Sequence, residues 1–347
     1  MTTLWDTTGT AVVKALAAER RTGGAVTSGL ALTLVIVVNH GDLEAAEEAA
    51  SIAASRHPMR MLVVIRQQFD APVPRLDAEV TIGGRLGPGE SVVLRMYGRL
   101  ALHAESVTLP LLAPDAPVVT WWYGEAPNKI AHDPLGVFAE RRITDVLHSA
   151  DPNAALQQRA VDFAPGDTDL AWTRLTPWRA ALASAFDGVR ERPTSATVLG
   201  GCNEPSARLL AGWLTARLAI DVAVDGSDDE PINGVEIVFP DGRATRATLE
   251  GSSLVLRRDG QQDSFMPFGE RPLGELLAEE LRRLDHDHVY AEALSTVTGI
   301  DDLEQRSPRR RHIWYDPATH TEARIDSAMG AGGEQVVVEE AAFGDGS

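Results

Sequence analysis

Hydrophobic and polar positions follow two different periods in the first 150 residues. Apolar residues recur at helical spacing from Thr7 to Arg21, whereas Leu32 to Val38 is apolar at every position but one, as in a strand buried on both faces. A helix from Asp42 to Ser55 and a second buried strand from Met59 to Ile65 complete a β-α-β crossover. Further strands are expected at Asp77–Ile82, Ser91–Tyr97 and Val118–Tyr123, with a helical stretch at 99–112. Residues 1–150 are therefore predicted to form an N-terminal α/β domain.

Residues 151–192 have the pattern of a helical connection. Pro177 fits the first turn of a helix, where its missing N–H costs no hydrogen bond. Thr176 is then expected to be the N-cap, and the helix to reach about Phe186.

A second α/β domain is expected over residues 193–300. A strand at Ala196–Leu199, a helix starting at Pro205 and a strand at Ile220–Val224 repeat the β-α-β pattern. From residue 234 to 268 the pattern becomes alternating, with Asp-Gly turns at 241–242 and 259–260, which predicts an antiparallel meander. An amphipathic helix follows Pro272, and the polar tail at 301–347 is expected to be loosely ordered. The prediction is thus an α/β fold: two α/β domains with mixed sheets, the second carrying the meander, joined by a helical segment.

The charge balance argues against two classes of binding partner. Acidic residues outnumber basic ones, 50 against 32, giving a formal net charge of −18. Phosphate backbones and anionic membranes both require basic surfaces, so no nucleic acid and no membrane partner is expected. The longest apolar run is about half a membrane span, the N-terminus lacks the pattern of a signal peptide, and the single cysteine, Cys202, excludes an internal disulfide. The expected location is cytoplasmic.

Aromatic residues are concentrated in two motifs. Four of the seven tryptophans lie between positions 121 and 178. The first motif is Pro-Val-Val-Thr-Trp-Trp-Tyr-Gly at 117–124, and the second, at 166–179, contains Trp and Arg beside aspartates. These residue types are enriched at binding hot spots. The candidate partner-binding residues are Trp121, Trp122, Asp167, Asp169, Trp172, Arg174, Trp178 and Arg179.

Both motifs resemble those of the glucose-6-phosphate dehydrogenase assembly protein family, often called OpcA, of actinobacteria. Three other stretches, at 32–38, 91–98 and 141–145, also agree with that family, so the resemblance covers roughly residues 1–300. It implies a non-catalytic accessory protein without a cofactor of its own. Such a protein would bind glucose-6-phosphate dehydrogenase, promote its assembly and activity in the oxidative pentose phosphate pathway, and so act as an allosteric activator.

The residues of the motifs leave other readings open. Arg174 and Arg179 near a helix N-terminus could hold an anion, so the alternative function is a sugar-phosphate- or nucleotide-binding enzyme or sensor. The tryptophans could equally pack a domain junction while the arginines pair with Asp167 and Asp169. Adjacent strand residues point to opposite faces, so one of Trp121 and Trp122 is expected to be buried and the other to face a cleft or partner.

Other candidate chemistry is weaker. The turn from Gly200 to Glu204 lies between a strand and a helix but lacks the spacing of a dinucleotide or P-loop motif, and its acidic residue would repel a phosphate. The run from Asp285 to His288 lacks a third ligand at metal-binding spacing. The remaining histidines, His148 among them, show no pairing that indicates a general base. No catalytic, cofactor or metal site is therefore predicted.

Overall fold

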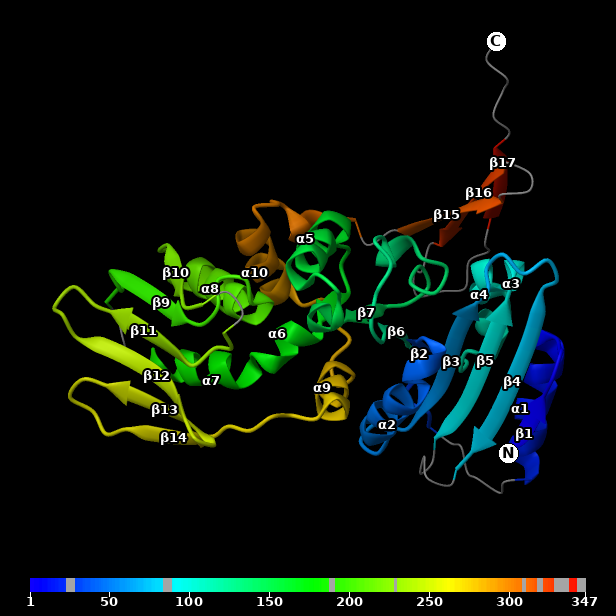
Figure 1. The fold of residues 1–347 in the computed structure, drawn as a ribbon, viewed down its shortest axis with the longest axis horizontal. Coiled ribbons are helices and arrows are strands. Elements are labelled where there is room, and N and C mark those ends of the chain that lie inside the picture. The colour runs from blue at the N-terminus through cyan, green and yellow to red at the C-terminus, as the bar shows by residue number, and fades with distance from the viewer. Residues whose placement is uncertain are drawn as a thin grey trace, which may run out of the picture. The chain divides into compact units, whose positions relative to one another are not determined.

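The computed structural model describes residues 1–22, 29–83, 89–186, 191–227 and 230–307, together with the backbone of 310–316, 321–327 and 337–341. The chain forms two compact units. Unit 1 contains residues 1–144, 277–285 and 307–347, and unit 2 contains residues 145–276 and 286–306. Each unit has helices packed on a mixed sheet, so the predicted α/β class is confirmed (Figure 1).

Seven strands of unit 1 form one sheet in the order β1-β4-β5-β3-β2-β6-β7. Its central strands are parallel: β5 (Glu90–Tyr97), β3 (Met59–Gln67), β2 (Leu32–Val37), β6 (Val118–Trp122) and β7 (Arg141–Thr144). Two antiparallel strands, β4 (Arg75–Ile82) and β1 (Thr2–Leu4), continue it to an edge. The predicted crossover is confirmed as β2, α2 (Leu43–Ala54) and β3.

One face of this sheet packs against three helices: α1 (Gly9–Thr22), α3 (Arg99–Leu102) and α4 (Ala104–Thr108). Val12 and Leu16 of α1 meet Leu76 and Val80 of β4 in one buried cluster. The helical stretch expected at 99–112 is thus two short helices and a 3-10 turn, Leu109–Leu111. Figure 1 shows α2 beside β2 and β3, and five of its alanines are buried: Ala46, Ala49, Ala50, Ala53 and Ala54.

Unit 2 has a six-stranded sheet in the order β10-β9-β11-β12-β13-β14. The parallel pair β9 (Ser195–Leu199) and β10 (Val222–Asp225) is joined by α8 (Pro205–Leu218). The predicted meander is confirmed as β11 (Gly234–Val238), β12 (Ala244–Glu250), β13 (Ser253–Arg258) and β14 (Ser264–Pro267). Gly242 and Gly260 take the positive φ that the Asp-Gly turns require.

The core of unit 2 also contains the helices before the sheet: α5 (Pro152–Asp162), α6 (Leu170–Arg174) and α7 (Thr176–Ala185). Residues of the expected connection therefore share a hydrophobic cluster with β9 and α8. The units differ in this respect from the division at 150, 192 and 300 expected from the sequence. The reason is that Trp172 and Trp178 are buried in the core of unit 2, whereas the side chains of a linker would be largely exposed.

Two helices follow the meander. The first, α9 (Leu273–Glu280), is the amphipathic helix expected after Pro272. The second, α10 (His288–Thr298), was not expected, and Asp287 caps it by accepting the Tyr290 backbone N–H. Residues 301–347, expected to be loosely ordered, include a 3-10 turn at Leu303–Gln305 and an antiparallel sheet of β15 (Arg310–Asp316), β16 (Thr321–Ser327) and β17 (Val337–Ala341). Among the described residues, no helix is long and apolar enough to cross a bilayer.

Candidate functional site

The aspartates of the second motif bind backbone groups in the interior of unit 2. Asp167 and Asp169 flank Thr168 in the short strand β8 (Asp167–Asp169), and both are buried. Asp167 accepts the Ala164 N–H at 2.8 Å, and Asp169 accepts those of Ala171 and Val146. Asp169 thereby caps α6 and fixes the preceding loop. These contacts are with the chain's own backbone.

Trp172 is fully buried and has its own set of partners. Its Nε1–H donates to Asp287 Oδ2 at 2.9 Å, and its ring lies 5.9 Å from that of Tyr290. The Arg179 guanidinium lies 3.7 Å from the centre of the indole, a cation–π contact. Trp172 thus links α6 to α10, and Arg179 covers its face.

Trp178 packs on the end of the meander. It is buried, with its ring 5.7 Å from that of Phe268 in an edge arrangement. The N-cap of α7 is Leu175, and Thr176 is its first residue, so the expected cap at Thr176 is wrong by one position. Without a side-chain cap, the Arg179 N–H is satisfied by the Leu175 carbonyl at 2.9 Å.

Trp121 and Trp122 are both buried, at 1% exposure each. The expectation that one of them faces a cleft or partner is wrong in this respect. Their strand, β6, is paired on both sides, and its two faces are covered. Trp122 lies against Gly136, where an added Cβ would be 3.1 Å from its ring and 1.8 Å from the Ile130 carbonyl oxygen. Space for this indole therefore depends on a residue without a side chain.

Arg174 is the candidate partner-binding residue that lines a pocket. Both of its terminal nitrogens donate to the buried Asp145 carboxylate, each at 2.8 Å, and His148 Nδ1 donates to the same carboxylate at 2.8 Å. Burial alone would raise the pKa of Asp145, but the hydrogen bonds from His148 and Arg174 outweigh it and hold the pKa below its usual value. The bond to Asp145 in turn raises the pKa of His148. The cluster therefore favours a negative Asp145 between two cations.

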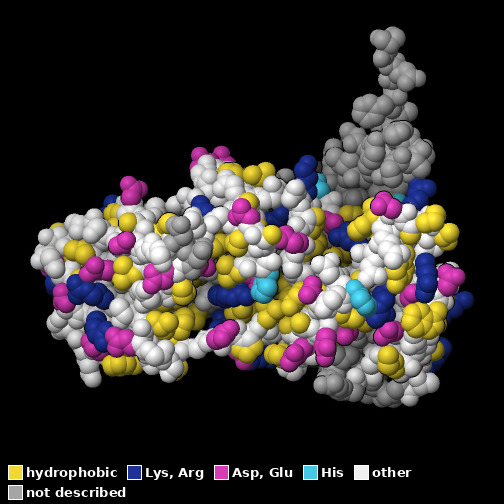
Figure 2. Space-filling view, in the orientation of Figure 1, with side chains coloured by type: hydrophobic (Ala, Val, Ile, Leu, Met, Phe, Trp, Pro, Cys, Tyr) yellow, Lys and Arg dark blue, Asp and Glu magenta, His cyan; other side chains and the backbone are white. Residues whose placement is uncertain are grey.

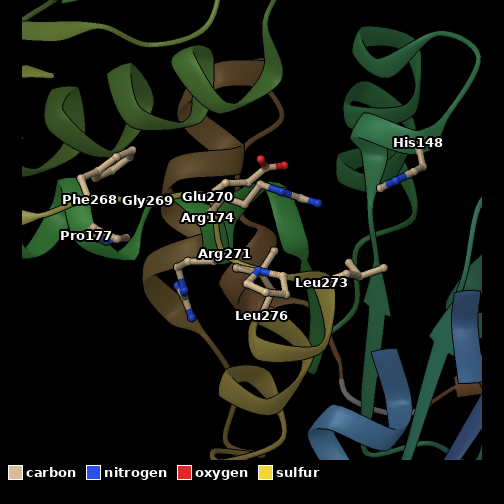
Figure 3. Close-up of a pocket in the computed structure, with 10 residues that line it drawn as sticks. His148, Arg174, Pro177, Phe268, Gly269, Glu270, Arg271, Leu273 and Leu276 are labelled. Atoms are coloured by element: carbon tan, nitrogen blue, oxygen red, sulfur yellow. The ribbon is translucent and has the colours of Figure 1, made fainter. Parts of the chain in front are cut away.

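A pocket of about 460 Å³ opens beside this cluster, within unit 2. Its lining combines Arg174, His148, Arg271 and Glu270 with apolar groups from the α7 start and the 268–276 segment. Figure 3 shows the Arg174 and His148 side chains pointing toward each other, whereas Arg271 extends away from them. In a chain of net charge −18, a concave site with three basic side chains and one acidic one suits an anionic group next to an apolar one.

Sequence reasoning missed three residues that line this pocket, His148, Glu270 and Arg271, and also Asp145, which pairs with His148 and Arg174. A signal for two of them was available, because His148 follows Asp145 by three residues in a stretch of helical turn. The structure shows that His148 pairs with Asp145, a pairing that sequence reasoning did not identify. Glu270 and Arg271 carry no local signal, since they follow the meander almost 100 residues beyond Arg174.

Other candidate residues have structural partners. The Glu204 carboxylate accepts the Ala207 N–H at 2.6 Å, so it occupies the N-terminus of α8 where a phosphate would bind. Cys202 is exposed in the turn before it. In unit 1, Arg141 donates to Glu280 at 3.1 Å, and both side chains are buried.

Two family models match the chain. Residues 50–161 match the N-terminal domain of the glucose-6-phosphate dehydrogenase subunit, and residues 165–294 match the C-terminal domain of that subunit. Together the two matches cover more than half of the chain and both halves of its sequence. Comparison with curated proteins gives no match.

Proposed function

Since this chain belongs to the glucose-6-phosphate dehydrogenase assembly protein (OpcA) family, we propose that it is a non-catalytic accessory protein that binds glucose-6-phosphate dehydrogenase and promotes its assembly and activity. The observation that carries this proposal is the pair of family matches, which follow one another along the chain from residue 50 to residue 294. The pathway served would be the oxidative pentose phosphate pathway, in the cytoplasm.

The mechanism of such an accessory protein is a shift of population. A protein that binds the active arrangement of an enzyme more tightly than its inactive forms stabilises that arrangement by the difference in binding free energy. The hydride transfer and its NADP then belong to the dehydrogenase, and the accessory chain needs no cofactor. In this proposal it acts as an allosteric activator.

The geometry of the Trp and Arg motif supports a positioning role for most of its residues. Trp121, Trp122, Trp172 and Trp178 are at most 2% exposed, so they can act on a partner only through the surface that they hold in place. The surface held by the second motif is the rim of the pocket at Arg174 and His148. We therefore place the candidate contact on that rim, with Arg174 and Arg271 as residues that meet the partner.

Reconstitution tests this function. Purified dehydrogenase from the same source is assayed for NADP reduction with and without the protein, and the mixture is analysed by size-exclusion chromatography. We expect a stable complex and raised activity. A mixture with neither would overturn the proposal.

A charge reversal tests the contact surface. Arg271→Glu changes the pocket rim without removing a core side chain. We expect the variant to activate the dehydrogenase only at a concentration at least tenfold higher than the wild type needs. Arg192→Glu makes the same change at an exposed site of unit 2 outside the pocket and should leave activation unchanged. Equal activation of the dehydrogenase by the two variants would show that the contact lies outside the pocket rim.

A second candidate function is a sensor that binds a sugar phosphate in this pocket. The observation that favours it is the set of basic side chains around an apolar floor. Calorimetry of the isolated protein with glucose 6-phosphate distinguishes the two functions. Micromolar binding that Arg174→Ala abolishes would support the sensor, and no heat of binding beside a functional complex would exclude it. Arg179→Ala serves as the comparison, because Arg179 stacks on Trp172 and does not line the pocket.

A further inference from the structure

Unit 1 has a groove of about 590 Å³ that is distinct from the pocket of unit 2. It lies between the N-terminus of α1, the start of β4 and helices α3 and α4, with Thr8, Thr10, Val13, Leu76, Leu100 and Val107 among its lining residues. Leu76 and Val107 belong to the buried cluster beneath, so the floor of the groove is continuous with the core of the unit.

None of the eleven residues that line the groove is charged. Its apolar groups are accompanied only by hydroxyls, from threonines and Ser106. Arg75 and Asp77 flank Leu76 in β4 and form an ion pair with each other, but alternation along a strand directs them to the opposite face. An uncharged groove in a chain of net charge −18 is a local exception to the acidic surface.

The rim of the groove exposes large apolar side chains. Val73, next to lining residue Pro74, is 71% exposed, and Trp5, two residues before Thr7, is 66% exposed. Leu109, next to Pro110, and Phe69, in the loop of Val73, are also exposed. Figure 2 shows hydrophobic side chains gathered on unit 1 around α3 and the start of β4. Exposed apolar side chains that border a groove are typical of a protein–protein interaction surface.

Backbone hydrogen bonds hold the two rim segments in place. In the loop of Val73, the N–H groups of Ala71 and Gly98 both donate to the Gln68 carbonyl, at 2.8 and 3.0 Å. Gly98 has φ +61°, and a Cβ there would lie 2.6 Å from the Ala71 carbonyl oxygen. On the other side, the Thr7 N–H donates to the Leu76 carbonyl at 2.8 Å. A surface fixed in this way loses little conformational entropy on binding.

We propose that this groove docks an uncharged, apolar segment of the dehydrogenase partner, which fills it with aliphatic or aromatic side chains and bonds to the hydroxyls. The inference rests on the proposed accessory function and adds the surface and its chemistry. Because the groove has no charge, binding there should depend weakly on salt, in contrast to binding through the acidic remainder of the surface.

Two matched pairs of substitutions test the proposal on the full-length protein. Val73→Asp places a charge on the rim, and Val161→Asp places the same charge at a valine of unit 2 that is 56% exposed. Phe69→Asp and Phe265→Asp form the second pair, again one in each unit. The readout is the Kd for purified dehydrogenase by biolayer interferometry, with thermal unfolding of each variant.

We expect the unit 1 variants to raise Kd at least tenfold and the unit 2 variants to leave it within about twofold, with all four melting like the wild type. Equal Kd for all four variants and the wild type would overturn the groove assignment, as would equal weakening by all four. Failure of the wild type to bind the dehydrogenase would instead overturn the accessory function itself.

A second copy of this chain is the competing occupant. Sedimentation of the protein alone distinguishes it: self-association that Val73→Asp abolishes, with affinity for the dehydrogenase unchanged, would overturn the proposal. A monomer that binds the dehydrogenase through the rim residues supports it.

Discussion

Trp172 donates its indole N–H to Asp287, 115 residues further along the chain, at 2.9 Å. The other carboxylate oxygen of Asp287 accepts the Tyr290 N–H at 2.9 Å and so caps α10. One side chain therefore satisfies a buried indole and starts the helix that packs against it. This relationship gives the Trp and Arg motif its position in unit 2.

Asp287→Ala removes both interactions, and we expect it to lower the free energy of unfolding by about 2–4 kcal/mol. About 1 kcal/mol comes from the cap and the remainder from the indole N–H left without its acceptor. Urea denaturation measures the change. Asp285→Ala, at an exposed neighbour, is the control and should alter stability by less than about 0.5 kcal/mol.

Asp145→Asn leaves Arg174 beside a neutral amide. Breaking a buried ion pair costs about 3–5 kcal/mol, and the partial exposure of Arg174 favours the lower end of that range. The measurement is again equilibrium unfolding, near neutral pH. A loss of unfolding free energy below about 1 kcal/mol would show that water solvates the Arg174 guanidinium in the variant and that the ion pair behaves as a surface interaction.

His148→Gln should change how stability depends on pH. The pKa of His148 is raised in the folded protein by its bond to Asp145, so the contribution of its charge is fully present below the ordinary histidine pKa and is lost as pH rises through the folded pKa. We expect the free energy of unfolding of the wild type to exceed that of the variant by at most about 1 kcal/mol at pH 5.5, because the imidazole is half exposed. The difference should shrink as pH rises through the folded pKa. A difference in unfolding free energy that grew with pH would contradict stabilisation by a charged His148 bonded to Asp145.

Gly212→Ala tests the contact of α8 with α10. Alanine in a helix interior ordinarily stabilises by about 1 kcal/mol over glycine. Here a Cβ would lie 2.7 Å from the Ala293 carbonyl oxygen and 2.5 Å from a Val297 methyl, so we expect a net loss of about 1–3 kcal/mol. Gly41→Ala, where nothing lies within 4 Å, should be neutral or stabilising.

Trp172→Ala and Trp178→Ala are expected to impair activation of the dehydrogenase. Truncating a buried tryptophan lowers the free energy of unfolding by about 3–5 kcal/mol. We therefore expect the loss of activation to accompany a displaced pocket rim and a lower melting temperature. Activity and thermal unfolding are measured on the same preparations. Variants that melt like the wild type and activate fully would show that the motif does not support the contact surface.

Local patterns were sufficient for much of the fold. The period-two alternation at 234–268 and the Asp-Gly turns predicted the meander, and the apolar runs at 32–38 and 59–65 predicted the parallel strands, because both patterns reflect which faces of a single segment are buried. Strand β7 carried no such pattern. Its Arg141 is buried beside Glu280, 139 residues away, which accepts a hydrogen bond from it.

The candidate site shows the same division. The sequence by itself determined that tryptophan and arginine gather in two motifs, that the chain is acidic and that both motifs resemble one family. Only the tertiary structure decided that the tryptophans are interior, that Arg174 pairs with Asp145 and that Glu270 and Arg271 complete the pocket. The reason is that residue spacing encodes the geometry within one element, whereas burial and charge pairing depend on which distant elements pack together.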